Sequence, residues 1–220
     1  DEKNYLKIVD YKAENNALNF SILNSHRSYD NVVLNMAGSH NALNSTACFA
    51  VSKVLEIPFG KYRESINSFK TVDRRLQLKF DANGVKVYDD YSHHPVEVTA
   101  SLKGLKEMST GRLRTVFQPH LFTRTRDFYN EFAQALAISD EVLLMDIYPA
   151  REKPIEGITS ELILNEALNQ NKNMKLVHES RDILAWLIND LKPGDIIVFQ
   201  GAGDVTNLCN EFVNILKNNN

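Results

Sequence analysis

Three short stretches hold residue types suited to binding or catalysis, and each stands where an apolar run gives way to a helical pattern. They are 89–95 (Asp-Asp-Tyr-Ser-His-His-Pro), 118–126 (Gln-Pro-His-Leu-Phe-Thr-Arg-Thr-Arg) and 200–204 (Gln-Gly-Ala-Gly-Asp). In open parallel sheets, ligands bind beyond the carboxyl ends of the strands. These three junctions are therefore where the sequence places a candidate site.

The first junction carries two adjacent carboxylates. Asp90 follows a strand-like run, and a carboxylate fixed there can accept hydrogen bonds from the paired hydroxyls of a ribose. Asp89, Asp90 and Ser92 are equally suited to cap a following helix. That helix would begin near Pro95, a favourable first-turn residue. The spacing alone leaves both interpretations open.

The same junction holds two neighbouring histidines, His93 and His94. Residues that are adjacent on entry to a helix diverge by about 100°, and no third ligand follows at a recognised spacing, so a metal pair is rejected. The sequence predicts no metal site here. One imidazole is expected either to shape a substrate pocket or to pack within the loop.

The second junction is cationic. His120, Arg124 and Arg126 surround the amino terminus of a predicted helix, a position that favours anions. Arg124 can hold a carboxylate through two parallel hydrogen bonds. The alternative is that these arginines form ion pairs with Asp127 or Glu131 on the same helix. Both interpretations have similar weight on spacing alone.

The third junction is rich in glycine. Gly201, Ala202, Gly203 and Asp204 open a helix after a strand, so their backbone amides can approach an anionic group. The motif lacks a third glycine and an acidic residue about 20 positions later, which makes it a poor dinucleotide fingerprint. A helix-capping turn explains it equally well.

The first third of the chain is predicted to be the end of one domain. Alternating apolar residues over 1–37 predict short strands, and helical spacing predicts helices over 41–55 and 61–69. Segment 70–74 is polar and aperiodic, so a domain boundary is predicted there. The two predicted domains are 1–71 and 72–220.

The second domain opens with a hairpin pattern and continues with alternating strands and helices. Asn83-Gly84 between the apolar runs 76–80 and 85–88 is typical of a type I′ turn. The later helices repeat apolar residues at i, i+3 and i+4, and the strands are nearly continuous apolar runs. This predicts an α/β fold with a doubly wound, mainly parallel sheet. The expected helices are 95–108, 127–138, 160–169, 181–191 and 205–216, and the expected strands are 114–117, 141–145, 175–177 and 195–199.

Composition narrows the class of protein. The 220 residues are 43% hydrophobic with a formal charge of -3, which suits a globular chain and disfavours a general nucleic-acid binder. No apolar run approaches the roughly 20 residues of a membrane span, so no membrane partner is expected. Cys48 and Cys209 lack metal-ligand spacing and fall on apparently apolar helix faces, which predicts buried free thiols and a cytoplasmic protein. The polar start at Asp1–Asn4 enters directly into strand-like sequence, which suggests a piece of a longer protein.

Several segments resemble the Mur ligase family, both in their residue types and in their order along the chain. They are Gly38–Asn44, Asp73–Leu76, Asp89–Pro95, Phe117–Arg126, Tyr148–Ile155 and Gly201–Asp204. The resemblance spans almost all of the chain. It implies that 1–71 is the C-terminal part of a central ATP-binding domain and that 72–220 is a C-terminal Rossmann-like domain that closes over the amino acid and ATP.

The resemblance also implies roles for individual residues. Asn41 should contact adenine, Tyr91 should flank it, and Asp90 should bind the ribose. Arg75 should reach the ATP phosphates. The residues expected toward the substrate are His120 and Arg124 as catalytic groups, with His93, Arg126, Gly201, Ala202, Gly203 and Asp204 as binding groups.

The implied activity is ATP-dependent amide synthesis that joins L-alanine to UDP-N-acetylmuramate through an acyl phosphate. ATP and Mg²⁺ would be required, but the chain has no phosphate-binding loop, so the family's missing N-terminal domains should supply most of that site. The chain alone should then be inactive. Leu121 stands where many relatives carry arginine, so two adjacent cationic side chains are not expected to bind the substrate here. Arg124 is therefore the main candidate for a cationic contact with the substrate. Two alternatives are a murein peptide ligase that attaches a recycled peptide and a non-catalytic nucleotide-binding or docking module.

Overall fold

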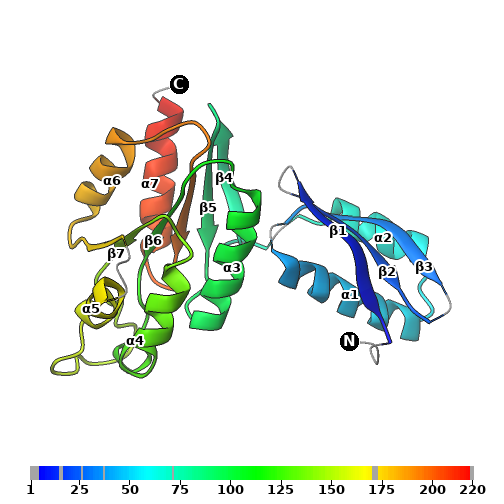
Figure 1. The fold of residues 1–220 in the computed structure, drawn as a ribbon, viewed down its shortest axis with the longest axis horizontal. Helices are drawn as coiled ribbons and strands as arrows, with labels where there is room; N and C mark the ends of the chain where they lie inside the picture. The colour runs from blue at the N-terminus through cyan, green and yellow to red at the C-terminus, as the bar shows by residue number, and fades with distance from the viewer. Residues whose placement is uncertain are drawn as a thin grey trace. The chain divides into compact units, whose positions relative to one another are not determined.

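The computed structural model describes residues 5–14, 17–25, 27–36, 38–70, 72–169 and 173–218. It consists of two compact units, Asp1–Thr71 and Val72–Asn220 (Figure 1). Each unit has its own sheet and its own hydrophobic core.

The first unit is a three-stranded antiparallel sheet with two helices. Leu18, Phe20 and Ile22 alternate along the central strand and are buried, as their spacing predicts. They pack with Phe49 and Tyr62 from the helices. The strands are β1 (Lys7–Glu14), β2 (Ala17–Leu23) and β3 (Ser28–Leu34), and the helices are α1 (Ser39–Val54) and α2 (Phe59–Ser68).

The second unit begins with the predicted hairpin, formed by β4 (Gln77–Ala82) and β5 (Val85–Asp90). Asn83 and Gly84 have φ angles of 54° and 76°, so both central residues adopt the left-handed conformation that a type I′ turn requires. The hairpin prediction is confirmed.

The hairpin is the edge of a six-stranded sheet with the order β4-β5-β9-β6-β7-β8, parallel from β5 onward. The last strand of the chain lies between β5 and β6. The predicted α/β fold with a mainly parallel sheet is confirmed. The further strands are β6 (Leu113–Phe117), β7 (Glu141–Leu144), β8 (Met174–Leu176) and β9 (Ile196–Gln200), and the helices are α3 (Pro95–Met108), α4 (Phe122–Leu136), α5 (Glu161–Asn169), α6 (Ser180–Asn189) and α7 (Val205–Asn218).

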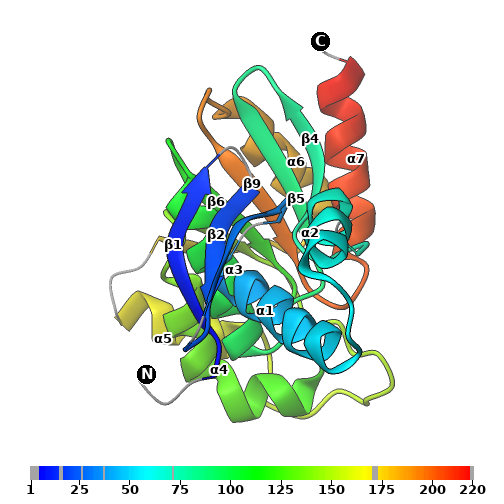
Figure 2. The same cartoon turned by 90° about the vertical axis from the view of Figure 1, so that its right-hand side faces the viewer.

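Helices cover both faces of this sheet. α6 and α7 pack on one face, and α3, α4 and α5 lie on the other; Figure 2 shows the same elements turned by 90°. Phe199 of β9 packs against Phe212 of α7, and Phe117 of β6 packs against Phe132 of α4. This arrangement follows from right-handed crossovers, because the connections run outward from β5 to β8 and then return to β9.

Two local predictions need correction. α4 begins at Phe122, five residues before the predicted start, and has a non-helical residue at Phe128, so its first turn does not continue the apolar pattern that locates the rest of the helix. Cys48 is exposed, because the buried face of α1 runs through Ser45, Phe49 and neighbouring positions and passes beside it; Cys209 is buried as predicted. Within the described residues, every helix is too short or too polar to cross a bilayer.

Candidate functional site

The three polar junctions follow strands that lie side by side. Asp90 and Phe117 are both register partners of Gln200, the last residue of β9. The carboxyl ends of β5, β9 and β6 therefore form one row, and the chain after each strand emerges at the same edge of the sheet. The predicted convergence of the junctions is confirmed at the level of the backbone.

Asp90 connects neighbouring strand ends through two buried hydrogen bonds. It is 1% exposed, and its Oδ1 accepts a hydrogen bond from the Leu76 amide at 3.2 Å while its Oδ2 accepts one from Gln200 Nε2 at 2.9 Å. The carboxylate thus joins the start of the hairpin to the end of β9. The sequence does not reveal this structural role, and it differs from the helix capping considered for Asp89, Asp90 and Ser92. The cap of α3 is His94, which forms a capping box with Glu97.

Arg74, which sequence reasoning passed over in favour of Arg75, reaches the glycine-rich turn. Its Nη2 donates to the carbonyl oxygens of Gly201 at 2.6 Å and Gly203 at 3.2 Å. The guanidinium also lies 4.8 Å from the centroid of the Tyr91 ring, within cation–π range. Arg74 therefore links the first and third junctions. Adjacent arginines signal a cationic segment, but the sequence cannot tell which of them faces the turn.

A row of rings connects the first junction to the second. The Tyr91 and His93 rings are 5.2 Å apart, the His93 and His120 rings are 5.7 Å apart, and the His120 ring stacks on Tyr148 at 5.8 Å. The backbones of His120 and Tyr148 form a bridge, so the loops after β6 and β7 are held together. The structure therefore brings the predicted residues Tyr91, His93 and His120 into one row.

Arg124 joins the end of this row. Its Nη1 lies 3.2 Å from His120 Nδ1 and 3.4 Å from the His120 carbonyl oxygen. Burial lowers the pKa of His120, and the Arg124 charge lowers it further, so the imidazole is held toward its neutral form. Arg124 is in the first turn of α4, where the helix dipole adds to its attraction for anions.

Gln118 fixes the glycine-rich turn from the opposite side to Arg74. Its Nε2 donates to Asp204 Oδ1 at 2.6 Å, and its Oε1 accepts from the Val205 amide at 3.2 Å. Gly203 lies so close to Gln118 and Tyr148 that a Cβ atom at this position would collide with both side chains. Because Gly203 has no side chain, the glycine-rich turn can pack directly against the second junction.

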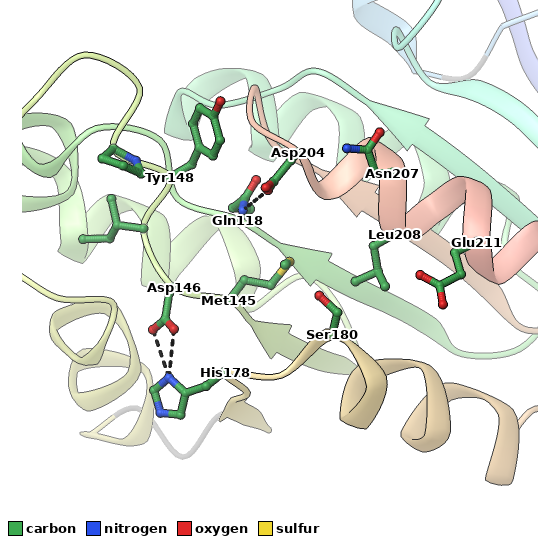
Figure 3. Close-up of a pocket in the computed structure, with 12 residues that line it drawn as sticks. Gln118, Met145, Asp146, Tyr148, His178, Ser180, Asp204, Asn207, Leu208 and Glu211 are labelled. Atoms are coloured by element: carbon green, nitrogen blue, oxygen red, sulfur yellow. Dashed lines mark hydrogen bonds and ion pairs between the residues drawn. The ribbon is translucent and has the colours of Figure 1, made fainter.

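A cavity of about 470 Å³ opens beside this turn (Figure 3). Tyr148, Gln118 and Asp204 line it, so it adjoins the row of rings through Tyr148. An exposed pair, His178 and Asp146, stands at its edge with 3.0 Å between Nδ1 and each carboxylate oxygen. Of the predicted site residues, only Asp204 lines this cavity; the other lining residues are Met145, Ile147, Pro149, Ser180, Asn207, Leu208 and Glu211.

Other predicted residues lie apart from this row or at its margin. Arg126 Nε contacts Asp127 Oδ1 at 2.7 Å on the exposed side of α4, which supports the ion-pair interpretation for this arginine. Arg75 lies 5.6 Å from the Tyr91 ring centroid and 3.8 Å from Glu97. Asn41 belongs to the first unit, in the first turn of α1, where its Oδ1 accepts from Asn44 at 3.4 Å.

The described residues contain no cluster of three or more His, Cys, Asp or Glu side chains placed to hold a metal ion. The anion-attracting groups of this unit are instead arginine side chains and a helix amino terminus. This chemistry fits a phosphate or carboxylate.

The fold and the junction residues define an α/β domain with arginine side chains at the carboxyl edge of its main sheet. A comparison with protein families gives the class directly. The chain belongs to the Mur ligase family, since the family model described as "Mur ligase, glutamate ligase domain" matches residues 74–203.

Comparisons with individual proteins show which members of the family this chain is similar to. The chain is 41% identical over 200 residues to the UDP-N-acetylmuramate–L-alanine ligase of Cytophaga hutchinsonii, covering 90% of this chain and 42% of that protein. Its fold matches the crystal structure of a UDP-N-acetylmuramate-alanine ligase from Thermotoga maritima with a TM-score of 0.83 and 23% identity, over 100% of this chain and 47% of that one. A Thermotoga maritima MurF ligase solved in complex with ADP matches with a TM-score of 0.76 and 19% identity, over 100% of this chain and 48% of that one. The chain thus spans less than half the length of each of these proteins.

Proposed function

We propose that this chain is part of an ATP-dependent ligase that joins L-alanine to UDP-N-acetylmuramate in the synthesis of the peptidoglycan precursor. The 41% identity to a protein of that name carries the proposal. The contact between His120 and Arg124 supports it, since it places a cationic group beside a neutral imidazole at a helix amino terminus. ATP and Mg²⁺ are the proposed co-reactants, with most of their ligands in the part of the protein that precedes this chain.

The reaction has two chemical steps. The muramyl carboxylate attacks the γ-phosphorus of ATP, which releases ADP and forms an acyl phosphate. The amine of L-alanine then attacks the acyl carbon, and phosphate leaves. Both steps build negative charge on oxygen atoms, so fixed cationic and N–H groups stabilise their transition states, and alignment of the two substrates contributes further.

Within this scheme, Arg124 is proposed to hold a carboxylate or phosphoryl oxygen, and its contact with His120 fixes the direction of the guanidinium. Arg75 is proposed to reach the ATP phosphates, with Tyr91 beside the adenine, where the base would share the ring with two guanidinium groups. Asn41 is proposed to be a further adenine contact. A ribose contact by Asp90 would use carboxylate lone pairs that its two internal hydrogen bonds leave over.

The test uses the full-length protein that contains this chain. Phosphate release from ATP should depend on both UDP-N-acetylmuramate and L-alanine, and a tripeptide in place of L-alanine should not support it. Arg124→Ala should raise the KM for L-alanine or lower kcat by about 10²-fold, as expected when a charged contact to substrate is lost. Arg181→Ala, which removes an 84% exposed arginine, is the matched control and should leave the kinetics unchanged. Phosphate release that prefers the tripeptide would assign the protein to peptide recycling instead.

A further inference from the structure

The two imidazoles of the ring row have different hydrogen-bond partners, and these partners fix their tautomers. His93 Nδ1 lies 2.9 Å from the carbonyl oxygen of Tyr91. A carbonyl oxygen can only accept a hydrogen bond, so His93 Nδ1 carries the proton. In the neutral ring, the other nitrogen, Nε2, then has a free lone pair.

His120 has the opposite arrangement. Its Nδ1 lies 3.2 Å from Arg124 Nη1, and a guanidinium group can only donate. Nδ1 of His120 is therefore the acceptor, and the proton of the neutral ring is on Nε2. Burial and the Arg124 charge both lower the pKa of His120, which favours the neutral ring, and the N–H donor of Arg124 selects its Nε2–H tautomer.

The local structure holds both rings in place. Glu97 accepts hydrogen bonds from the His93 and His94 amides at 3.2 and 3.3 Å, and its Oε2 lies 3.8 Å from His93 Nδ1. The His120 ring stacks on Tyr148 at an interplanar angle of 17°. Among the residues that the structure describes, none forms a hydrogen bond with Nε2 of either ring. The ring centroids are 5.7 Å apart, so a proton acceptor and a proton donor stand next to each other.

We propose that His93 and His120 form a complementary catalytic pair in which His93 Nε2 accepts a proton from the ammonium group of the incoming amino acid and His120 Nε2–H donates a hydrogen bond to an oxygen that gains negative charge. This assignment rests on the proposed function for its substrate. Its physical basis is the pair of opposite tautomers, which follows from the contacts of Tyr91 and Arg124.

In the proposed step, His93 and the departing phosphate each take one proton from the amine nitrogen. An amino acid arrives with an ammonium nitrogen, and transfer of one proton to His93 Nε2 frees the nitrogen lone pair. That pair forms the C–N bond to the acyl phosphate carbon, and the C–O bond to phosphate breaks. The second nitrogen proton leaves with the departing group, which becomes hydrogen phosphate. His120 keeps its proton throughout and only stabilises the oxyanion.

The tautomers can be observed directly in the 220-residue chain by long-range ¹H–¹⁵N correlation spectra of the imidazole rings, with assignments from His93→Gln and His120→Gln. The expected result is a protonated Nδ1 in His93 and a protonated Nε2 in His120. Arg124→Met should raise the pKa of His120 and release its fixed tautomer, whereas Arg181→Met should change neither. The same tautomer in both rings would overturn the proposal whatever substrate the enzyme uses.

Kinetics of the full-length protein test the roles. Glutamine at position 120 keeps an N–H donor near the place of Nε2, whereas glutamine at position 93 supplies no base. His93→Gln should therefore lower kcat by about 10²-fold or more, and His120→Gln should lower kcat by about tenfold or less. Equal losses would refute the division of roles. Absence of L-alanine-dependent phosphate release in the unaltered protein would instead count against the proposed function, and the spectra would still decide the pairing.

Discussion

Replacement of Asp90 by alanine tests its structural role, because the stability of the second unit can be measured without any ligand. Asp90→Ala removes the acceptor for two buried donors, the Leu76 amide and Gln200 Nε2. A buried donor that loses its partner costs about 1–3 kcal/mol, so the substitution should lower the free energy of unfolding of the second unit by about 2–6 kcal/mol. This is a large part of the roughly 5–15 kcal/mol that stabilises a typical domain.

Asp90→Asn is the matched control. Its amide oxygen can still accept from Leu76, and its new N–H group can donate to Gln200 if the Gln200 amide turns over. Gln200 Oε1 is buried without a hydrogen-bond partner in the described structure, so after this rotation Oε1 gains a donor while Nε2 takes its unpartnered place, and one of the two buried donors is left without an acceptor. The asparagine variant should therefore lose about 1–3 kcal/mol, roughly half of the loss in Asp90→Ala.

Trp186 provides the assay. It is the single tryptophan of the chain and lies in α6, where its Nε1 donates to Glu141 at 2.8 Å, so its fluorescence reports the second unit alone. With a urea dependence of about 2 kcal/mol per molar, Asp90→Ala should move the unfolding midpoint down by about 1–3 M. If the alanine variant unfolds within the error of the unaltered chain, Asp90 does not hold the strand ends, and the argument from burial fails.

Three further predictions concern the loops around the site. Leu121 has φ of 74°, a strained region for any residue but glycine, so Leu121→Gly should be about 1 kcal/mol more stable than Leu121→Ala in urea unfolding, and equal stabilities would contradict the strain. Gly203→Ala should destabilise the second unit by about 1–3 kcal/mol because the new methyl group displaces the side chains that pack against it; unchanged stability would show that they move freely. The hydrogen bond and charge of Asp146 raise the pKa of His178, so a titration followed by NMR should find it above the ordinary value and find it lowered in Asp146→Asn. The stabilisation from this pair should be present below pH about 6.5 and be lost as the pH rises through the raised pKa, whereas identical titrations of the two proteins would rule the interaction out.

The sequence predicted the features that depend on local or repeating patterns. The Asn83-Gly84 hairpin is specified by two residues with positive φ, and the position of each junction follows from where an apolar run ends. The alternation of strands and helices is enough to predict a parallel sheet. The order of the strands was not predicted, because insertion of β9 between β5 and β6 depends on contacts between residues about 80 to 110 positions apart.

The contacts within the site were harder to predict than its location. The sequence indicated His120 and Arg124 by residue type, but their direct contact depends on the first turn of α4, which begins earlier than its apolar pattern suggests. The choice between Arg74 and Arg75 depends on backbone direction after the domain boundary; Arg74 itself has φ of 57°. Spacing alone allowed Asp89, Asp90 and Ser92 either to cap α3 or to bind a ligand, whereas the structure buries Asp90 among the strand ends and has His94 as the cap.

Formation of the site depends on the insertion of β9, because the turn that follows this strand contacts residues from distant parts of the second unit. Its following turn is held from one side by Arg74, which bonds to Gly201 and Gly203, and from the other by Gln118, which bonds to Asp204. Arg74 precedes the hairpin and contacts Tyr91 of the first junction, whereas Gln118 belongs to the second junction. β9 lies between β5 and β6, the strands that these two junctions follow. The site is therefore complete only after the last strand has inserted between two that precede it in the chain. A change that weakens β9 should disturb the rings of both junctions together, because each is anchored to the same turn.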